Sequence, residues 1–379
     1  MAAHLPADPE RSSAHVLTLD EIDTPALVVD LEVVERNLER YARLARERGI
    51  KLRPHIKTHK SPYFAHMQLA SGAQGVTVAT LYEAEVMANA GITDILLAYP
   101  PIGKAKLQRL SALLQRVDVK VSLDSIAAAE PLSELAQALE KEIEIYIDVD
   151  TGLHRMGLPA GKPSAELGAA IDRLPGLNVV GVMSHCGQIG FGPTEKLPAG
   201  ARQDAEALVE TAELLRAAGV DVREVSPGST AGTPYAVEVK GVTEVRPGTY
   251  IFNDVNTVVN EIVPVSECAA SVLTTVVSVH PGDRAVIDAG SKALSSDRCP
   301  KREGFGLIKG WPELIIRSLS EEHGVIALGP GEAPFAVGDK IQVIPNHVCV
   351  AVNLAETMIL VRGERFVGRL PVAARGRGV

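Results

Sequence analysis

The sequence predicts an α/β chain: a (β/α)8 TIM-type barrel followed by a smaller, mostly β C-terminal domain. Between about residues 52 and 226, short apolar runs alternate with longer amphipathic runs. This alternation is typical of parallel strands joined by crossover helices, and about eight repeats in roughly 200 residues favour a closed barrel over an open sheet. After about residue 263, β-branched runs separated by Pro-Gly and Gly-Asp turns indicate a second domain built mainly of strands.

The barrel elements are predicted from apolar runs of strand length and amphipathic runs of helix length. A brief strand at 51–54, which a proline ends, comes first. Later strands are expected at 75–79, 94–98, 117–123, 142–148, 178–184 and 222–226. The intervening helices are expected at 81–90, 104–114, 126–140, 165–174 and 200–218.

Three parts are expected: an N-terminal tail over 1–22, the barrel over 23–262 and the β domain over 263–379. Strands of the β domain are predicted at 271–279, 284–287, 340–344 and 358–361. The apolar segment 23–30 precedes the barrel pattern and is a candidate to pack with the β domain instead.

Bulk properties favour a cytoplasmic enzyme. The 379 residues carry a net charge of -9 with 22% charged residues, whereas a nucleic-acid binder is normally basic. The first 20 residues contain no apolar run, which argues against a signal peptide, and no stretch reaches the roughly 20 apolar residues of a membrane span. The four cysteines lie far apart, which suits a reducing compartment.

Five basic or imidazole side chains lie within the eight residues from Arg53 to Lys60. They follow the first predicted strand, and catalytic groups of such barrels collect at the carboxyl ends of strands. A lysine there can act as a Schiff-base amine if burial and nearby cations lower its pKa. Composition alone leaves a phosphate patch or a solvated basic loop equally open.

His347 and Cys349 are two residues apart on a segment that we expect to be extended. Side chains at that spacing point to the same side of a strand, so both can hold one metal ion. The alternative is that they are ordinary packing residues. The loops with Gly228, Ser229 and Thr230 and with Gly248 and Thr249 follow predicted strands, and their small residues suit a phosphate or an ordinary turn.

Taken together and in order, these motifs resemble the fold-type III pyridoxal-phosphate family, which has an alanine racemase-like barrel and includes D-threonine aldolases and D-serine dehydratases. The resemblance runs from about residue 23 to about residue 369. It rests on the segments 24–30, 53–57, 148–152 with Arg155, 226–230, 246–250 and 345–349.

The resemblance implies a role for each motif. Lys57, rather than Lys60, binds pyridoxal 5′-phosphate covalently, with His55 beside it. Arg155 meets the phenolic oxygen of the cofactor, and His185 approaches its pyridine nitrogen or the substrate. The phosphate side is implied at Ser226, Gly228, Ser229, Thr230, Gly248, Thr249 and Tyr250. His347 and Cys349 hold a divalent metal ion, either zinc or manganese or magnesium.

The implied function is a lyase of D-3-hydroxy amino acids that works as a homodimer. A D-threonine aldolase breaks the Cα–Cβ bond, whereas a D-serine or D-3-hydroxyaspartate dehydratase removes water. The pattern His-x-Cys leans toward the dehydratase and zinc, while the segments 289–292 and 319–324 resemble the aldolases, which we place first. An amino-acid racemase would not need His347 and Cys349, and a non-enzymatic cofactor carrier would lack a second domain.

Overall fold

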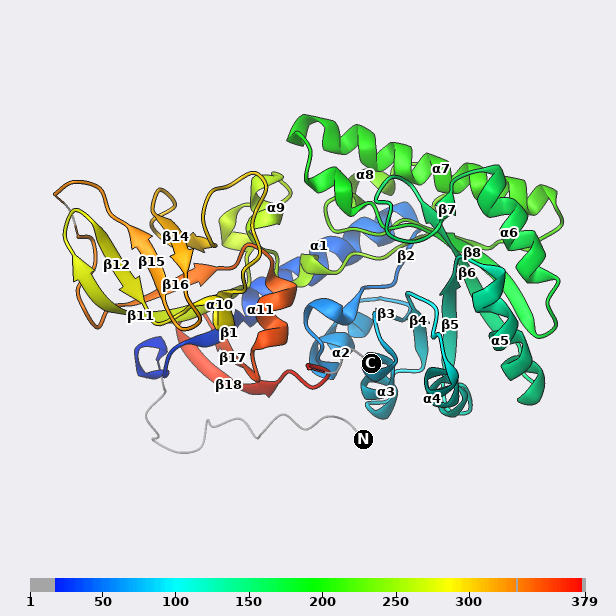
Figure 1. Cartoon of the computed structure of the whole chain (residues 1–379), viewed down its shortest axis with the longest axis horizontal. Coiled ribbons are helices and arrows are strands. Elements are labelled where there is room, and N and C mark those ends of the chain that lie inside the picture. The colour runs from blue at the N-terminus through cyan, green and yellow to red at the C-terminus, as the bar shows by residue number, and fades with distance from the viewer. Residues whose placement is uncertain (1–17, 332, 377–379) are drawn as a thin grey trace.

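Eight short parallel strands form the barrel in the computed structural model, which describes residues 18–331 and 333–376 (Figure 1). The six strands from β3 to β9 pair in the order β3-β4-β5-β6-β8-β9, and β10 pairs with β2. Backbone hydrogen bonds join the two sets: Thr77 N donates to Pro54 O at 2.8 Å and Thr243 N donates to Val225 O at 3.1 Å. The strands are β2 (Lys51–Leu52), β3 (Val76–Val78), β4 (Asp94–Leu97), β5 (Asp118–Leu123), β6 (Ile143–Asp150), β8 (Leu177–Met183), β9 (Glu224–Ser226) and β10 (Glu244–Val245).

Helices between the strands cover the outside of the barrel. They are α1 (Leu31–Arg48), α2 (Pro62–Ala70), α3 (Leu81–Asn89), α4 (Lys104–Leu114), α5 (Ile126–Ala138), α6 (Lys162–Asp172), α7 (Leu197–Ala217) and α8 (Thr233–Ala236). The short strand β7 (Leu158–Pro159) pairs with β6. The predicted fold class is confirmed, and most predicted elements lie within two or three residues of their observed bounds.

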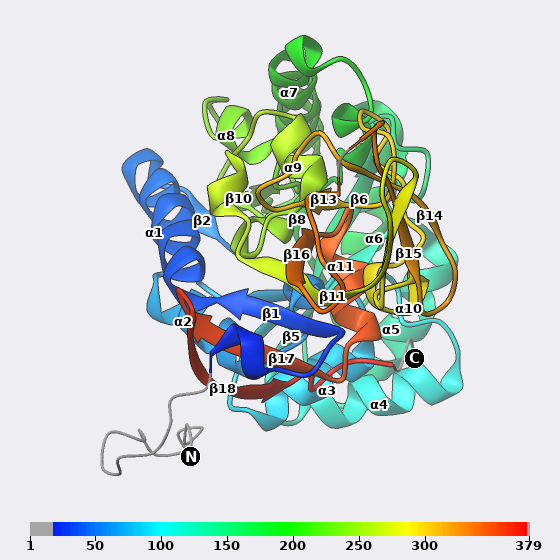
Figure 2. The ribbon, with the colours of Figure 1, turned by 90° about the vertical axis from the view of Figure 1, so that its left-hand side faces the viewer.

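The β domain is a nine-stranded sheet with the order β14-β15-β12-β11-β1-β17-β18, in which β16 also pairs with β11 and β13. β1 (Ala26–Asp30) lies between β11 and β17, so the segment 23–30 supplies a central strand of this sheet before α1 leads into the barrel (Figure 2). The other strands are β11 (Ala270–His280), β12 (Arg284–Ile287), β13 (Leu307–Ile308), β14 (Ile315–Leu319), β15 (Gly324–Ala327), β16 (Lys340–Ile344), β17 (Thr357–Arg362) and β18 (Arg365–Pro371).

Short helices lie between the barrel and the sheet. In Figure 1, α9 (Val255–Val259) and α11 (Val348–Leu354) lie in this central region, and α10 (Ser291–Leu294) lies beside α11. The 3-10 turns are η1 (Leu19–Glu21), η2 (Ile56–Thr58), η3 (Gly187–Gly190), η4 (Thr194–Lys196), η5 (Thr249–Ile251) and η6 (Val265–Glu267). Within the described residues, no helix is both long enough and apolar enough to cross a lipid bilayer.

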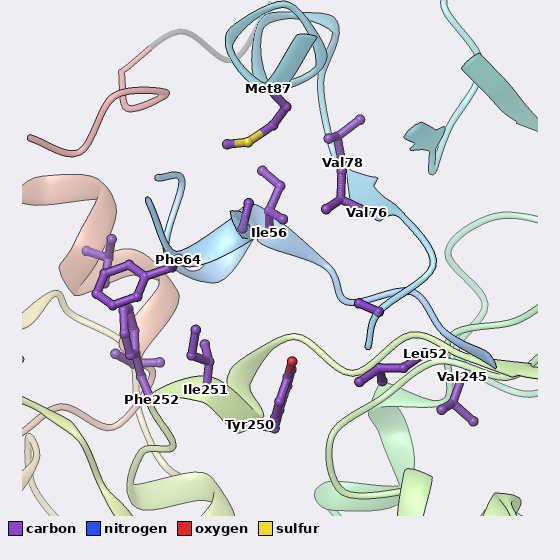
Figure 3. Close-up of a cluster of buried hydrophobic side chains, with 14 of the residues drawn as sticks. Leu52, Ile56, Phe64, Val76, Val78, Met87, Val245, Tyr250, Ile251 and Phe252 are labelled. Carbon is purple, nitrogen blue, oxygen red and sulfur yellow. The ribbon is translucent and has the colours of Figure 1, made fainter. Parts of the chain in front are cut away.

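Part of the core fixes the position of η2. Ile56 and Phe64 are fully buried, and Phe64 packs edge-on against Phe252 with ring centroids 5.1 Å apart (Figure 3). Complete burial of such a side chain stabilises the fold by about 2 kcal/mol. Because Ile56 is held in the core, the next residue, Lys57, has its position fixed as well.

Candidate active site

A cavity of about 350 Å³ lies where the carboxyl ends of the barrel strands meet the beginnings of α9 and α11. Most of the predicted site residues line it, namely His55, Lys57, Arg155, His185, Ser229, Thr230, Gly248, Thr249, His347 and Cys349. A hollow of about 520 Å³ lies near the start of β4 and β5, and none of the predicted site residues lines it. The cavity is therefore the place where the predicted groups can act together.

Lys57 reaches the cavity and Lys60 does not. The amine of Lys57 has no hydrogen bond or ion pair with the residues that the structure describes, and burial lowers its pKa, with Arg155 and Arg246 adding to this effect. Lys60 instead forms an ion pair with the buried Glu83, at 3.2 Å. Of the two lysines, Lys57 is the one whose amine is free to react.

His55 supports the turn that carries Lys57. Its Nδ1 accepts a hydrogen bond from the backbone N of Lys57 at 3.3 Å, as the N-terminal cap of η2. Burial and the charge of Lys57 hold the pKa of His55 well below its ordinary value, so the ring is neutral. A neutral ring that accepts at Nδ1 carries its proton on Nε2.

The loop that carries Arg155 is organised by a carboxylate. Asp150 accepts hydrogen bonds from Gly152 N at 2.9 Å, from His154 N at 3.0 Å and from His154 Nδ1 at 2.7 Å. Gly157 has a φ of 93°, and a Cβ there would lie 2.6 Å from Asp150 N, so this turn requires glycine. Asp150 is thus paired with His154 rather than Arg155, whose guanidinium lines the cavity.

His185 is a neutral hydrogen-bond acceptor toward the cavity. Its Nδ1 donates to the carbonyl oxygen of Gly228 at 2.9 Å, which leaves Nε2 unprotonated in the neutral ring. Burial, together with Lys57 and Arg155, lowers the pKa of His185 to about 3. The ring therefore stays neutral at ordinary pH.

The hydroxyl groups of the expected phosphate side lie together. Thr249 Oγ1 donates to Thr230 Oγ1 at 3.0 Å, and Ser229 Oγ accepts from Gly232 N at 2.8 Å. A Cβ on Gly248 would lie 3.2 Å from Thr58 Oγ1, so the glycine lets the backbone run close to η2. These loops offer hydroxyls and closely approaching backbone to an anion.

Three residues expected on the phosphate side do not line the cavity. The ring of Tyr250 is fully buried among core side chains (Figure 3). Its hydroxyl accepts from Gln68 Nε2 at 3.1 Å, and the ring packs on Tyr41. Ser226 Oγ donates to Glu244 at 2.7 Å. Gly228 is absent from the lining, although its carbonyl holds His185. The expected contact through the side chain of Tyr250 is thus replaced by core packing.

Arg246 is a cavity residue that sequence reasoning missed. It is buried, its Nε donates to Ser226 Oγ at 2.9 Å, and its Nη2 donates to the carbonyl oxygens of Ser184 and Ser226. The motif at 246–250 was noted for its glycine and threonine. The arginine itself gave no separate signal, because a charged residue before Pro-Gly is usually a surface residue.

The segment with His347 and Cys349 is not extended, contrary to the expectation. His347 is the N-terminal cap of α11, and Cys349 lies in its first turn. The helix begins here because Asp254 Oδ2 accepts a hydrogen bond from Val348 N at 3.1 Å, which satisfies a free donor of the first turn. Both side chains still line the cavity.

Asp254 also orients His347, whose Nδ1 lies 3.3 Å from Asp254 Oδ2. The Cys349 thiolate, with Asp254, raises the pKa of His347 to about 11. Burial raises the pKa of Cys349, but His347, Lys57 and Thr58 together outweigh burial and lower it overall. Thr58 Oγ1 lies 3.2 Å from Cys349 Sγ, which joins α11 to the lysine turn.

The His347–Cys349 pair fits a metal ion that keeps open positions. Among residues 18–331 and 333–376, no group of three or more His, Cys, Asp or Glu side chains is arranged to hold a metal. A thiolate and an imidazole suit zinc, and a carboxylate behind the histidine is the usual support of a metal ligand. Two protein ligands would leave the other positions to water or substrate.

Comparison with known proteins identifies the family. Residues 29–255 match the alanine racemase N-terminal domain, and residues 269–361 match a serine dehydratase domain. The chain belongs to the fold-type III pyridoxal-phosphate family that combines these two domains, as its motifs predicted.

Three relatives place the chain more closely. D-threo-3-hydroxyaspartate dehydratase of Delftia sp. strain HT23 is 36% identical over 353 residues, covering 88% of this chain and 92% of that protein. The crystal structure of D-threonine aldolase from Filomicrobium marinum has a TM-score of 0.89 and 33% identity, covering 97% of this chain and 99% of that chain. The structure of a cysteine-to-alanine variant of D-threo-3-hydroxyaspartate dehydratase in the metal-free form has a TM-score of 0.87 and 33% identity. The match covers 95% of this chain and 100% of that chain.

The cavity fits the cofactor that the family implies, pyridoxal 5′-phosphate. Lys57 supplies an amine that has no partner among residues 18–331 and 333–376 and has a lowered pKa, as covalent attachment requires. Ser229, Thr230 and Thr249 supply hydroxyls at one side of the cavity, and Arg155 supplies a cation. Both the reactive amine and the groups for a phosphate are present in one cavity.

Proposed function

We propose that the protein is a lyase dependent on pyridoxal 5′-phosphate and a divalent metal ion. Its substrates would be D-3-hydroxy amino acids, cleaved to glycine and an aldehyde as by a D-threonine aldolase. One observation carries this proposal: Lys57 and the His347–Cys349 pair line the same cavity. The relatives that are D-threonine aldolase and D-threo-3-hydroxyaspartate dehydratase support the class of substrate.

Lys57 would hold the cofactor covalently. The hydroxyls of Ser229, Thr230 and Thr249 would bind its phosphate, and Arg155 would bind its phenolic oxygen. When bound, the cofactor supplies an electron-withdrawing ring that stabilises negative charge on the α-carbon of an attached amino acid. His185 would face the cofactor or substrate as a neutral acceptor at Nε2.

His347 and Cys349 would hold the divalent ion, and the thiolate favours zinc over manganese or magnesium. When bound, the ion supplies a Lewis acid for the β-oxygen of the substrate. Asp254 would keep His347 in the orientation that binds metal. The relative with a cysteine replaced, described in a metal-free form, supports a metal at this kind of site.

Two groups of the chain could accept a proton in the cavity. The amine of Lys57 has a lowered pKa, so a larger share of it is neutral and basic at ordinary pH. His185 is neutral as well, but a pKa of about 3 makes it a weak base. Lys57 is therefore the better candidate for moving the proton of the α-carbon or the hydroxyl.

The second candidate function is dehydration of the same substrates to a 2-oxo acid and ammonia. Cys349 favours it, because a soft thiolate ligand selects zinc and the pattern His-x-Cys resembles the dehydratases. The Delftia relative with 36% identity is a dehydratase. A racemase would leave His347 and Cys349 without a role.

Product analysis tests the proposal. The purified enzyme with added cofactor would be given D-threonine, D-serine, D-threo-3-hydroxyaspartate and D-alanine. Glycine with an aldehyde supports the aldolase, and a 2-oxo acid with ammonia supports the dehydratase. Inversion of D-alanine without cleavage of any hydroxy amino acid would contradict both.

The homodimer and the cytoplasmic location remain predictions. Sedimentation of the enzyme with bound cofactor tests the first, and fractionation of the source cells tests the second.

A further inference from the structure

Asp204 is a buried carboxylate that accepts hydrogen bonds from two barrel loops. It lies in α7 and exposes only 3% of its surface. Thr151 Oγ1 donates to its Oδ1, and Ser184 Oγ donates to its Oδ2 at 3.1 Å. The Cys186 thiol also lowers the pKa of Asp204. Within the described residues, Asp204 forms no ion pair, and it does not line the cavity.

Each partner of Asp204 leads to a different part of the cofactor site. Thr151 begins the loop that carries Arg155. The carbonyl of Ser184 accepts a hydrogen bond from Arg246, and the next residue is His185. Cys186 Sγ lies 3.4 Å from Ser229 Oγ, in the loop expected to bind the phosphate.

The attachment of α7 to the barrel does not require this carboxylate. Ala201, Ala205 and Leu208 are fully buried on the same helix and give it an apolar face. A buried carboxylate without a cation is costly unless hydrogen bonds satisfy it. Burial does raise the pKa of Asp204, and the bonds from Thr151, Ser184 and Cys186 offset only part of that effect.

We propose that Asp204 is a positioning residue that fixes the loop of Arg155 relative to the loop 184–186, whose Cys186 Sγ lies 3.4 Å from Ser229 Oγ in the phosphate loop. Each carboxylate oxygen accepts from a different loop, so one side chain sets the separation of the two. The proposal rests on the proposed function, because these loops are the phosphate and phenolic-oxygen sides of the cofactor site.

Asp204→Asn tests the proposal in the full-length enzyme. The amide nitrogen cannot accept a hydrogen bond, so one loop loses its partner while the volume is conserved. The dissociation constant of pyridoxal 5′-phosphate should rise about tenfold, the size expected for a lost bond to a charged acceptor. Glu206→Gln is the matched control, since Glu206 is exposed on the same helix and loses the same charge.

Variants of Thr151 and Cys186 test the Arg155 loop and the phosphate loop separately, and they remain informative if Asp204→Asn does not fold. Thr151→Val removes one hydroxyl and should weaken binding of the whole cofactor about tenfold, while binding of inorganic phosphate changes less than about twofold. Thr151→Ser keeps the hydroxyl and should restore binding. Cys186→Ala removes a thiol next to the phosphate loop, so it should weaken the binding of both the cofactor and inorganic phosphate.

The outcomes distinguish this inference from the proposed function. If the unmodified protein does not bind the cofactor, the proposed function fails. If it binds the cofactor and Asp204→Asn binds it equally well, with only its melting temperature lowered, Asp204 has a purely structural role and the inference is wrong. Equal effects of Thr151→Val and Thr151→Ser would overturn it too.

Discussion

Lys57 and Lys60 are three residues apart and have opposite surroundings. Lys57 lines the cavity without a partner in the described part of the chain, whereas Lys60 neutralises Glu83, which is 1% exposed. A pattern of basic residues could not separate them, because both follow the same short strand. The resemblance of the segment 53–57 to a known family was needed to select Lys57, and the cavity agrees with that selection.

Lys57→Ala should abolish the visible absorbance of lysine-bound cofactor, and Lys60→Ala should keep it. Lys60→Ala should nevertheless lower stability by about 3 kcal/mol, because it leaves the buried Glu83 carboxylate unpaired. Absorbance spectra and urea unfolding measure the two effects separately. Reduction with borohydride and peptide mapping that found the cofactor on Lys60 would reverse the assignment.

Burial of Asp148 should make the free energy of unfolding of the cofactor-free protein depend on pH. Burial raises the pKa of Asp148 to about 6 from 3.8, so the folded chain binds its proton more tightly than the unfolded chain does. The stability linked to this group is therefore greatest below about pH 4 and falls as pH rises to about 6, by about 3 kcal/mol in all. Asp148→Asn should be more stable than the unmodified chain at pH 7 and nearly equal to it at pH 4. Urea unfolding at both values checks this, and an equal difference at the two pH values would contradict it.

Cys349→Asp should move the metal preference from zinc toward manganese or magnesium, because a carboxylate is a harder ligand than a thiolate. We expect the ratio of the two dissociation constants to change in favour of manganese, with retro-aldol cleavage gaining on elimination. Metal titration monitored by activity measures both. A variant that kept the zinc preference would show that Cys349 is not a ligand.

Helix α11 shows what the local sequence pattern of a helix or strand cannot predict. The barrel strands were predicted because buried parallel strands read as apolar runs, and the antiparallel strands β12 and β16 of the β domain have the predicted bounds. The segment after residue 345 was misassigned, because residues two apart can share a direction at a helix start as well as on a strand. The hydrogen bond from Val348 N to Asp254 decides for a helix, and it joins residues 94 positions apart.

Charged residues whose roles depend on distant partners were missed for the same reason. Asp254, Arg246 and Asp204 acquire their roles from partners on other elements, which no local pattern records. The opposite error occurred at Tyr250, which belongs to a motif but packs in the core.

Asp254→Asn should separate helix capping from metal binding. Asparagine is also a good N-terminal cap, so α9, capped by Asp254 through Thr257 N at 3.1 Å, should persist. When the amide oxygen of asparagine takes the place of Oδ1 and caps α9, the amide nitrogen takes the place of Oδ2. His347 and Val348, which now share Asp254 Oδ2, then lose their acceptor. Zinc affinity should fall about 10- to 100-fold.

Asp30→Asn is the matched control, because Asp30, the last residue of β1 in the β sheet, caps α1 and does not line the cavity. Competition with a zinc chelator gives both affinities. Equal affinity in the Asp254 and Asp30 variants would remove Asp254 from the metal site.

The whole molecule brings two distant parts of the chain to one cavity. The barrel contributes Lys57, the chain then passes through most of the β sheet, and α11 returns with Cys349 to within 3.2 Å of Thr58. The strand β1 and helix α1 tie the same two parts together at the other end of the chain (Figure 1). Sequence patterns predicted both parts, but their meeting point depends on side-chain contacts across the whole fold.

We propose that Lys57 and the His347–Cys349 pair act on one substrate, although Lys57 binds the cofactor and the pair binds the metal ion independently of each other. The most direct test is the turnover of D-threonine by enzyme from which a chelator has removed all metal, with the absorbance of the bound cofactor recorded in the same sample. We predict that cleavage is lost, that the absorbance stays, and that added zinc or manganese restores cleavage. Full cleavage of D-threonine by metal-free protein would contradict the claim and leave His347 and Cys349 as packing residues.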